Sequence, residues 1–328
     1  MRFDVAARDY LRQINSCGFE EAALALFHFQ KEHCAVYQAY LKAIHQDQKQ
    51  VSRLCDIPFL PISFFKTHEV KTGNGAVQFS FASSGTTGLE TSRHLVQRPE
   101  LYEMCALAGF KKFYGEPAPY AFLALLPSYL ERSNSSLVYM AQLLMQASGH
   151  PANGFFKDDF ERLAQTLQQL EKAGQPVLLL GVTFGLLDFA ERFPMPLKHT
   201  LVMETGGMKG RRAEWTRAEV HAFLKEQFLL PAIHAEYGMT ELFSQAYSKG
   251  SGIFYPIDTM RVLLRDPQDP LSCFEQGRGA LNIIDLANVD SCAFIATEDL
   301  GQIQADGGFQ VLGRMDHSAL RGCSLLMA

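Results

Sequence analysis

The chain has 328 residues, of which 47% are hydrophobic and 20% are charged, so it can bury a large core and is not expected to be disordered. Its formal net charge is −5, and no basic cluster is longer than two residues. This argues against nucleic acid as a partner, because phosphate-backbone binding needs a basic face. Seven scattered cysteines without a CxxC pair predict neither a disulfide framework nor a zinc site.

The sequence carries no recognisable signal for export or membrane insertion. The first residues, 1–5, include an early acid and lack the apolar region of a signal peptide. The longest apolar stretch, 177–187, is too short to span a bilayer. We therefore expect a cytoplasmic protein without a transmembrane segment.

The first fifty residues predict helices, because apolar side chains recur there near helical spacing. Gly18 is expected to separate a short first helix from a longer second one. The stretch 57–61, which contains two prolines, should end the helical region, since proline fixes φ and removes a backbone donor.

From Val77 onward, short apolar runs alternate with longer amphipathic ones. Strands are expected at 120–126, 176–181 and 199–203, and helices at 137–147, 184–192 and 216–228. Thr183 and Thr216 are predicted to cap the last two helices, and Glu219 has the spacing of a capping box with Thr216. This alternation predicts a largely parallel sheet covered by helices. After Tyr255, short segments between Asp, Pro and Gly turns predict an antiparallel subdomain.

The most informative segment is the hexapeptide 83–88, Ser-Ser-Gly-Thr-Thr-Gly, which follows a strand-like run. Glycine lets backbone N–H groups turn inward, and hydroxyls donate to the same oxygens, so this segment predicts a loop around a polyphosphate such as that of ATP. The alternative is a polar turn between two strands. The residues concerned are Ser83, Ser84, Gly85, Thr86, Thr87 and Gly88.

The segment 237–241, Tyr-Gly-Met-Thr-Glu, brings an aromatic ring, a hydroxyl and a carboxylate out of one tight turn. Tyr237 could stack on a base, Thr240 could bond a phosphate oxygen, and Glu241 could hold Mg²⁺ together with the substrate's own phosphates. A helix N-terminus with a favourable acid is the alternative.

Three other segments suit the same nucleotide. The glycine pair within 204–210 could let a flat ring lie against backbone. Asp299, at an expected strand end, could accept bonds from both ribose hydroxyls. Arg314 could pair with a phosphate or ribose oxygen, because its planar fork suits such acceptors. Taken alone, the glycine pair is more often an ordinary turn, and the Asp299 segment could be a surface turn.

Together and in this order, the five segments resemble the core motifs of the adenylate-forming superfamily, which contains acyl-CoA ligases and adenylation domains. The form of the hexapeptide is similar to the phenylacetate–CoA ligase branch. The resemblance implies the α/β large-domain fold of these enzymes, with helix-covered, mostly parallel sheets and a small antiparallel β subdomain. It also implies ATP and Mg²⁺ as cofactors. The implied first step is attack of a carboxylate on the α-phosphorus, which gives acyl-AMP and pyrophosphate.

The resemblance implies roles for individual residues. The hexapeptide would hold the β- and γ-phosphates, and Glu241 would bind Mg²⁺. Thr240 would contact the α-phosphate. The implied nucleotide-binding residues beyond the hexapeptide are Gly206, Gly207, Met208, Tyr237, Gly238, Thr240, Asp299 and Arg314.

A closer resemblance, over nearly the whole chain, is to the LuxE family, the acyl-protein synthetases of the bacterial fatty-acid reductase complex. It is carried by segments 57–61, 64–66, 127–132, 135–137 and 321–326, the last reading Arg-Gly-Cys-Ser-Leu-Leu. The family resemblance implies a fatty acid substrate and transfer of the acyl group to a cysteine, which matches Cys323. It also implies a reductase as acyl-accepting partner.

Cys323 is suited to this role chemically, since a thiolate attacks a mixed anhydride and Arg321 could favour the thiolate. The alternative is a small apolar cysteine in the chain's tail. Typical superfamily members continue beyond Gly-Arg-x-Asp into a small domain with a catalytic lysine, whereas this sequence ends at Ala328. We therefore expect adenylation without that lysine or with a partner that supplies it. The same departure puts CoA in doubt as the acceptor.

Further residues carry weaker expectations. Tyr129, Phe184 and Gly185 are candidates for the acyl pocket, with core packing as the alternative for Phe184. Arg93 and His94 follow the hexapeptide and could touch phosphate or form a solvated turn.

The expected organisation is one continuous unit in four parts: an N-terminal helical region (1–75), an α/β adenylation core (76–255), a β-rich subdomain (256–312) and a C-terminal tail (313–328). Two functions besides the acyl-protein ligase stay open. One is an acyl-CoA or acyl-carrier ligase, and the other is a non-catalytic subunit that binds nucleotide.

Overall fold

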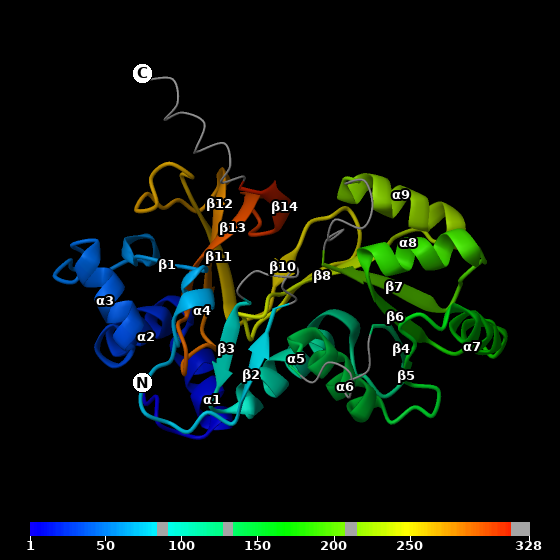
Figure 1. Cartoon of the computed structure of the whole chain (residues 1–328), viewed down its shortest axis with the longest axis horizontal. Coiled ribbons are helices and arrows are strands. Elements are labelled where there is room, and N and C mark those ends of the chain that lie inside the picture. The colour runs from blue at the N-terminus through cyan, green and yellow to red at the C-terminus, as the bar shows by residue number, and fades with distance from the viewer. Residues whose placement is uncertain (84–90, 127–133, 207–214, 316–328) are drawn as a thin grey trace, which may run out of the picture.

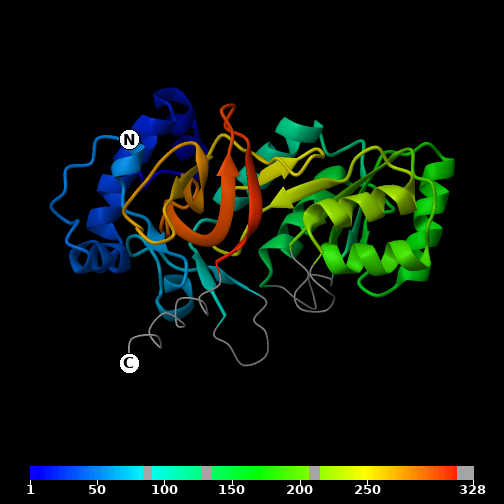
Figure 2. The ribbon, with the colours of Figure 1, turned by 90° about the horizontal axis from the view of Figure 1, so that it is seen from above.

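The computed structural model describes residues 1–83, 91–126, 134–206 and 215–315. In both views the five-stranded sheet lies between the N-terminal helices and a seven-stranded sheet (Figures 1 and 2). A two-stranded hairpin, β2 (Phe79–Ala82) with β3 (Arg93–Val96), forms a third sheet.

The seven-stranded sheet has the order β10-β9-β8-β7-β6-β4-β5. Its strands from β8 to β5 are parallel, and β9 and β10 are antiparallel to their neighbours. The strands are β4 (Ala121–Leu125), β5 (Gly154–Phe155), β6 (Val177–Val182), β7 (Thr200–Thr205), β8 (His234–Tyr237), β9 (Ala246–Ser248) and β10 (Tyr255–Pro256).

Helices cover both faces of this sheet, as the burial of β4 shows. Phe122 and Ala124 pack into a core that includes α5 (Pro99–Tyr114) and α6 (Ser136–Ser148). The alternate residues of β4 pack into a second core with α7 (Phe160–Lys172), α8 (Thr183–Arg192) and α9 (Arg217–Phe228). Burial on both sides explains why β4 and β6 read as continuous apolar runs.

The five-stranded sheet contains β11 (Met260–Arg265), β12 (Gly277–Asp285), β13 (Phe294–Ile303) and β14 (Phe309–Arg314), which pair in antiparallel fashion. The antiparallel texture predicted after Tyr255 is therefore present. The sheet also gains a parallel strand, β1 (Leu60–Pro61), on β13. The sequence pattern indicated only a break in helix here, because a two-residue strand that contains proline carries no periodic signal.

The N-terminal helices pack against this sheet and the turn after β12. They are α1 (Ala7–Cys17), α2 (Phe19–His33), α3 (Ala35–Ala43), the 3₁₀ turn Leu54–Asp56 and α4 (Phe64–Thr67). The Gln30 side-chain amide donates to the carbonyls of Asn288 and Val289, and the Tyr10 hydroxyl donates to that of Leu286. Gly18 separates α1 from α2 as predicted, with φ at +88°.

One predicted helix cap is wrong and the other is right. Thr183 is the first residue of α8, and its hydroxyl bonds to Glu204 and Gly206 instead of a helix N–H. Thr216 caps α9 in a reciprocal capping box with Glu219.

None of the helices within the described ranges is long and apolar enough to cross a membrane. The division into four parts stays a prediction.

Thr216→Ala should lower the free energy of unfolding by about 1 kcal/mol, because it removes the hydroxyl that accepts from the Glu219 N–H. Urea titration followed by circular dichroism measures this. Thr166→Ala is the matched control, since Thr166 lies half-buried within α7, where its hydroxyl bonds only to the Arg162 carbonyl of the same helix and alanine is a better helix former. Equal losses in the two variants would contradict the capping role.

Candidate functional site

The candidate site lies where parallel strands end. Val182 of β6 pairs with Thr205 of β7, and Thr205 pairs with Glu236 of β8, so these three strands end at one level. Gly206 and the segment 238–241 therefore leave the sheet at the same edge. In open α/β sheets, ligands bind outside the carboxyl ends of the strands.

A hydrogen-bonded chain joins this edge to the five-stranded sheet. The Tyr237 hydroxyl donates to Asp299 Oδ2 over 2.9 Å, and Arg314 Nε donates to Asp299 Oδ1 over 3.2 Å. Asp299 and Arg314 are direct partners across β13 and β14. Burial raises the pKa of Tyr237 well above its ordinary value, so the phenol keeps its proton. The structure thus brings together three residues predicted to bind nucleotide.

The Asp299 side chain is 7% exposed, whereas that of Arg314 is 77% exposed. The Tyr237 ring packs edge-on against Phe309. Tyr237, at one end of this series of hydrogen bonds, is consequently fixed in the core, whereas Arg314, at the other end, reaches solvent.

Glu241 follows β8 and is buried. Burial raises the pKa of its carboxyl, and a hydrogen bond from the Ser92 side chain together with the charges of Arg314 and Lys66 partly offsets this effect. The buried Asp285 accepts hydrogen bonds from the N–H groups of Phe243 and Ser244 and fixes the chain just beyond.

The hairpin β2–β3 frames the start of the hexapeptide. Ser83 N–H donates to the Ser92 carbonyl, and Ser92 N–H donates to Ser83 Oγ, both over 3.0 Å. Ser83 therefore lies near Ser92, whose side chain helps to lower the pKa of Glu241. His94, predicted to touch phosphate or lie in a solvated turn, is instead fully buried and bonds to the Thr240 carbonyl.

Several predicted site residues lie outside the described residues: Ser84, Gly85, Thr86, Thr87, Gly88, Tyr129, Gly207, Met208 and Cys323. The described acyl-pocket candidates, Phe184 and Gly185, lie in the first turn of α8, directly after β6. A Cβ on Gly185 would lie in ordinary contact with Val182 and Leu125.

Gly206 adopts a φ of +79°, which favours glycine at the end of β7. Gly238 is required for a different reason. A Cβ there would come within 2.3 Å of Glu236 Oε1, so any side chain would displace that buried carboxyl.

Two buried carboxyls, Glu204 and Glu236, lie two residues before these glycines in β7 and β8, and they were not identified from the sequence. Burial opposes charge on Glu204, but His221 Nε2, 3.5 Å from its carboxylate, and the hydrogen bond from Arg217 hold its pKa below the ordinary value. Burial raises the pKa of Glu236 to about 7, and its carboxyl accepts from the Thr205 hydroxyl. Acids inside otherwise apolar strand runs were the signal that could have revealed them.

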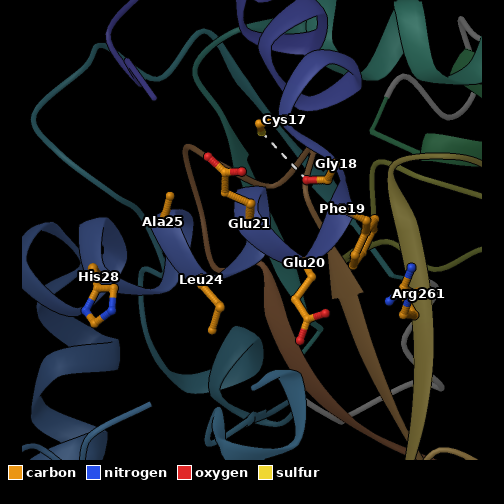
Figure 3. A pocket seen from close by; sticks show the side chains of 9 residues that line it. All are labelled: Cys17, Gly18, Phe19, Glu20, Glu21, Leu24, Ala25, His28 and Arg261. Carbon is orange, nitrogen blue, oxygen red and sulfur yellow. Dashed lines mark hydrogen bonds between the residues drawn. The ribbon is translucent and has the colours of Figure 1, made fainter. Parts of the chain in front are cut away.

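A separate hollow of about 780 Å³ lies on α1 and α2, away from these residues (Figure 3). Arg261 lies over the Phe19 ring at its edge, at 4.4 Å from the centroid. This hollow contains none of the residues predicted to bind substrate.

Within the described ranges, no three His, Cys, Asp or Glu side chains are grouped to hold a metal.

Several solved structures resemble this chain. ATP-bound MatB from Rhodopseudomonas palustris matches with a TM-score of 0.56 and 14% identity over 74% of this chain and 49% of that one. A luciferase-like enzyme from the nonluminescent mealworm Zophobas morio matches with a TM-score of 0.53 and 16% identity over 75% and 59%. O-succinylbenzoate coenzyme A synthetase (MenE) from Bacillus subtilis, in complex with AMP, matches with a TM-score of 0.51 and 16% identity over 73% and 50%.

These similarities show the fold of adenylate-forming enzymes and confirm the predicted fold class. The chain spans about half the length of the MatB and MenE structures. No protein-family model and no curated protein sequence matches it.

The Glu236 carboxyl should make stability depend on pH. Its pKa in the folded state, about 7, lies above its ordinary 4.5, so its favourable contribution is complete at low pH and is lost as pH rises through 7. The free energy of unfolding of Glu236→Gln should therefore rise by about 1–3 kcal/mol relative to that of the wild type as the pH increases from 5 to 8. Urea titrations across this range measure it.

Glu226→Gln is the control for this experiment, because Glu226 is exposed on α9 and should follow the wild-type profile. Parallel profiles for the wild type and Glu236→Gln would show that the Glu236 carboxyl does not take up a proton on folding.

Proposed function

We propose that this protein activates a carboxylic acid with ATP. A carboxylate oxygen attacks the α-phosphorus, the bond from that phosphorus to the bridging oxygen breaks, and acyl-AMP and pyrophosphate form. One observation carries the proposal: Tyr237, Asp299, Arg314 and Glu241 come from two sheets and meet at one strand-end edge. The fold shared with ATP-bound MatB and AMP-bound MenE supports it.

Asp299 suits a ribose. Each of its oxygens accepts one hydrogen bond, from Tyr237 or Arg314, and each carboxylate oxygen can accept a second. Two free acceptor positions on one rigid carboxylate match two neighbouring hydroxyls. The exposed Arg314 guanidinium has further N–H groups for a ribose or phosphate oxygen.

Glu241 suits Mg²⁺. A carboxylate is a preferred ligand of this cation, and a nearby positive charge would relieve the cost of burying the charged form. Because no described cluster of three ligands is present, the substrate's phosphates and water would complete the coordination. When bound, Mg²⁺ supplies positive charge to the pyrophosphate as it leaves. The chain's own task is to align the acid with the α-phosphorus and exclude water.

The resemblance to acyl-protein synthetases extends the proposal to a second step. The Cys323 thiolate attacks the acyl carbonyl carbon of acyl-AMP, and the bond from this carbon to the phosphate oxygen breaks. AMP is released, and the acyl group stays on the protein as a thioester. A fatty acid is the proposed substrate, and an acyl reductase is the proposed acceptor. Cys323 lies outside the described residues, so its sequence context supports this step.

CoA is a second candidate acceptor. The observation that favours it is the structural similarity to O-succinylbenzoate coenzyme A synthetase. Incubation with acid, ATP and CoA separates the two, because free acyl-CoA without a protein thioester would support the second candidate.

The first step predicts acid-dependent exchange of pyrophosphate into ATP. Glu241→Gln should slow the exchange by about 100-fold, since it removes a charged metal ligand from a preorganised site. Glu32→Gln, on the exposed side of α2, should keep the wild-type rate. Absence of exchange in the wild type across a broad panel of acids would overturn the proposal and favour a non-catalytic nucleotide-binding subunit.

The second step predicts a hydroxylamine-sensitive acyl adduct on the protein after incubation with ATP and a fatty acid. Intact-protein mass spectrometry should show its loss in Cys323→Ser and its retention in Cys17→Ser. An undiminished adduct in Cys323→Ser would exclude Cys323 as the acceptor.

A further inference from the structure

Buried side chains from two distant elements hold the turn that carries Thr240 and Glu241. His94 Nδ1, on β3, lies 3.0 Å from the Thr240 carbonyl oxygen. Asn288 Nδ2, after β12, donates to the Glu241 carbonyl oxygen over 2.8 Å. Both side chains are fully buried, so two consecutive carbonyls of the candidate Mg·ATP turn accept hydrogen bonds from donors fixed in the core.

The surroundings of His94 fix its orientation and tautomer. Its ring stacks on Phe243, with centroids 4.5 Å apart, and meets Phe65 edge-on. Burial lowers its pKa to about 4, so the ring is neutral near pH 7. Since a carbonyl only accepts, Nδ1 carries the proton. Nε2 has no hydrogen-bond partner within the described residues, which makes the bond to Thr240 the ring's polar anchor there.

The same strand reaches the hexapeptide. Ser92, two residues before His94, binds Ser83 Oγ through its N–H, and its side chain lies close enough to Glu241 to lower the pKa of that carboxyl. Ser92 and His94 are both buried, whereas Arg93 between them is exposed, so both point toward the turn. Strand β3 therefore ties the start of the hexapeptide to the Thr240–Glu241 turn.

We propose that His94 is a positioning residue that fixes the Thr240–Glu241 turn relative to β3 and Ser83 and so sets the Mg²⁺ requirement for binding ATP. It acts through the carbonyl of Thr240 and touches neither metal nor nucleotide. The inference rests on the proposed function, because it assumes that Mg·ATP binds here.

The test compares two variants with the wild type. His94→Phe keeps a ring to stack on Phe243 but removes the donor, which leaves the partly buried Thr240 carbonyl without this hydrogen bond. His94→Asn offers an amide N–H near the position of Nδ1. Calorimetric titration of ATP at a series of Mg²⁺ concentrations gives the Mg²⁺ needed for half-maximal binding. We expect His94→Phe to need about 10-fold more Mg²⁺ and His94→Asn to recover part of this shift.

The control is His234→Phe. His234 begins β8, is partly buried and lies 3.2 Å from the Tyr114 hydroxyl, but has no contact with the turn in the described structure. It should leave the Mg²⁺ requirement unchanged even where the melting temperature falls. A purely structural role for His94 would lower the melting temperature without shifting the Mg²⁺ requirement.

The outcomes separate this inference from the proposed function. If the wild type binds Mg·ATP and His94→Phe binds it with the same Mg²⁺ requirement, the positioning role is wrong and the proposed function stands. If the folded wild type binds no Mg·ATP at any Mg²⁺ concentration, both are wrong. A shift in His94→Phe that His94→Asn partly reverses supports both.

Discussion

The hydrogen bond from Tyr237 to Asp299 is the interaction on which the candidate site depends. Its two partners come from different sheets, one at the carboxyl end of a parallel strand and the other on an antiparallel strand. Both are buried, so losing either would leave the other without its polar partner in the core. The bond therefore fixes how the two sheets meet, and Arg314 extends the contact from the core to solvent.

The surrounding polar groups follow the same rule. Asp285, Glu204 and Glu236 lie in or at the ends of strands, and each buried carboxyl accepts hydrogen bonds from a neighbouring element. Burying such groups is costly unless they are paired, so their partners are specified along with them. These hydrogen bonds therefore fix the buried carboxyls to neighbouring elements at the strand ends. In the described structure, such bonds from His94, Asn288 and Asp285 hold the segment 240–244, which has little secondary structure of its own.

Sequence patterns predicted the main elements because burial on both faces of a parallel sheet leaves long apolar runs such as that of β6. They also predicted the capping box at Thr216, whose partners are three residues apart. They did not predict the bond of Thr183 to Glu204 or that of His94 to Thr240, because these contacts join residues 21 and 146 positions apart. Residue types and spacing brought Tyr237, Asp299 and Arg314 forward as candidates, but only the fold relates them in space.

A crystal structure of the protein with Mg·ATP tests the central claim most directly. We predict that the ribose hydroxyls lie within hydrogen-bond distance of Asp299, that the Tyr237–Asp299 bond is retained, and that the metal lies against the Glu241 carboxylate. A nucleotide bound elsewhere, or one bound at this edge without contact to Asp299 and Glu241, would contradict the account.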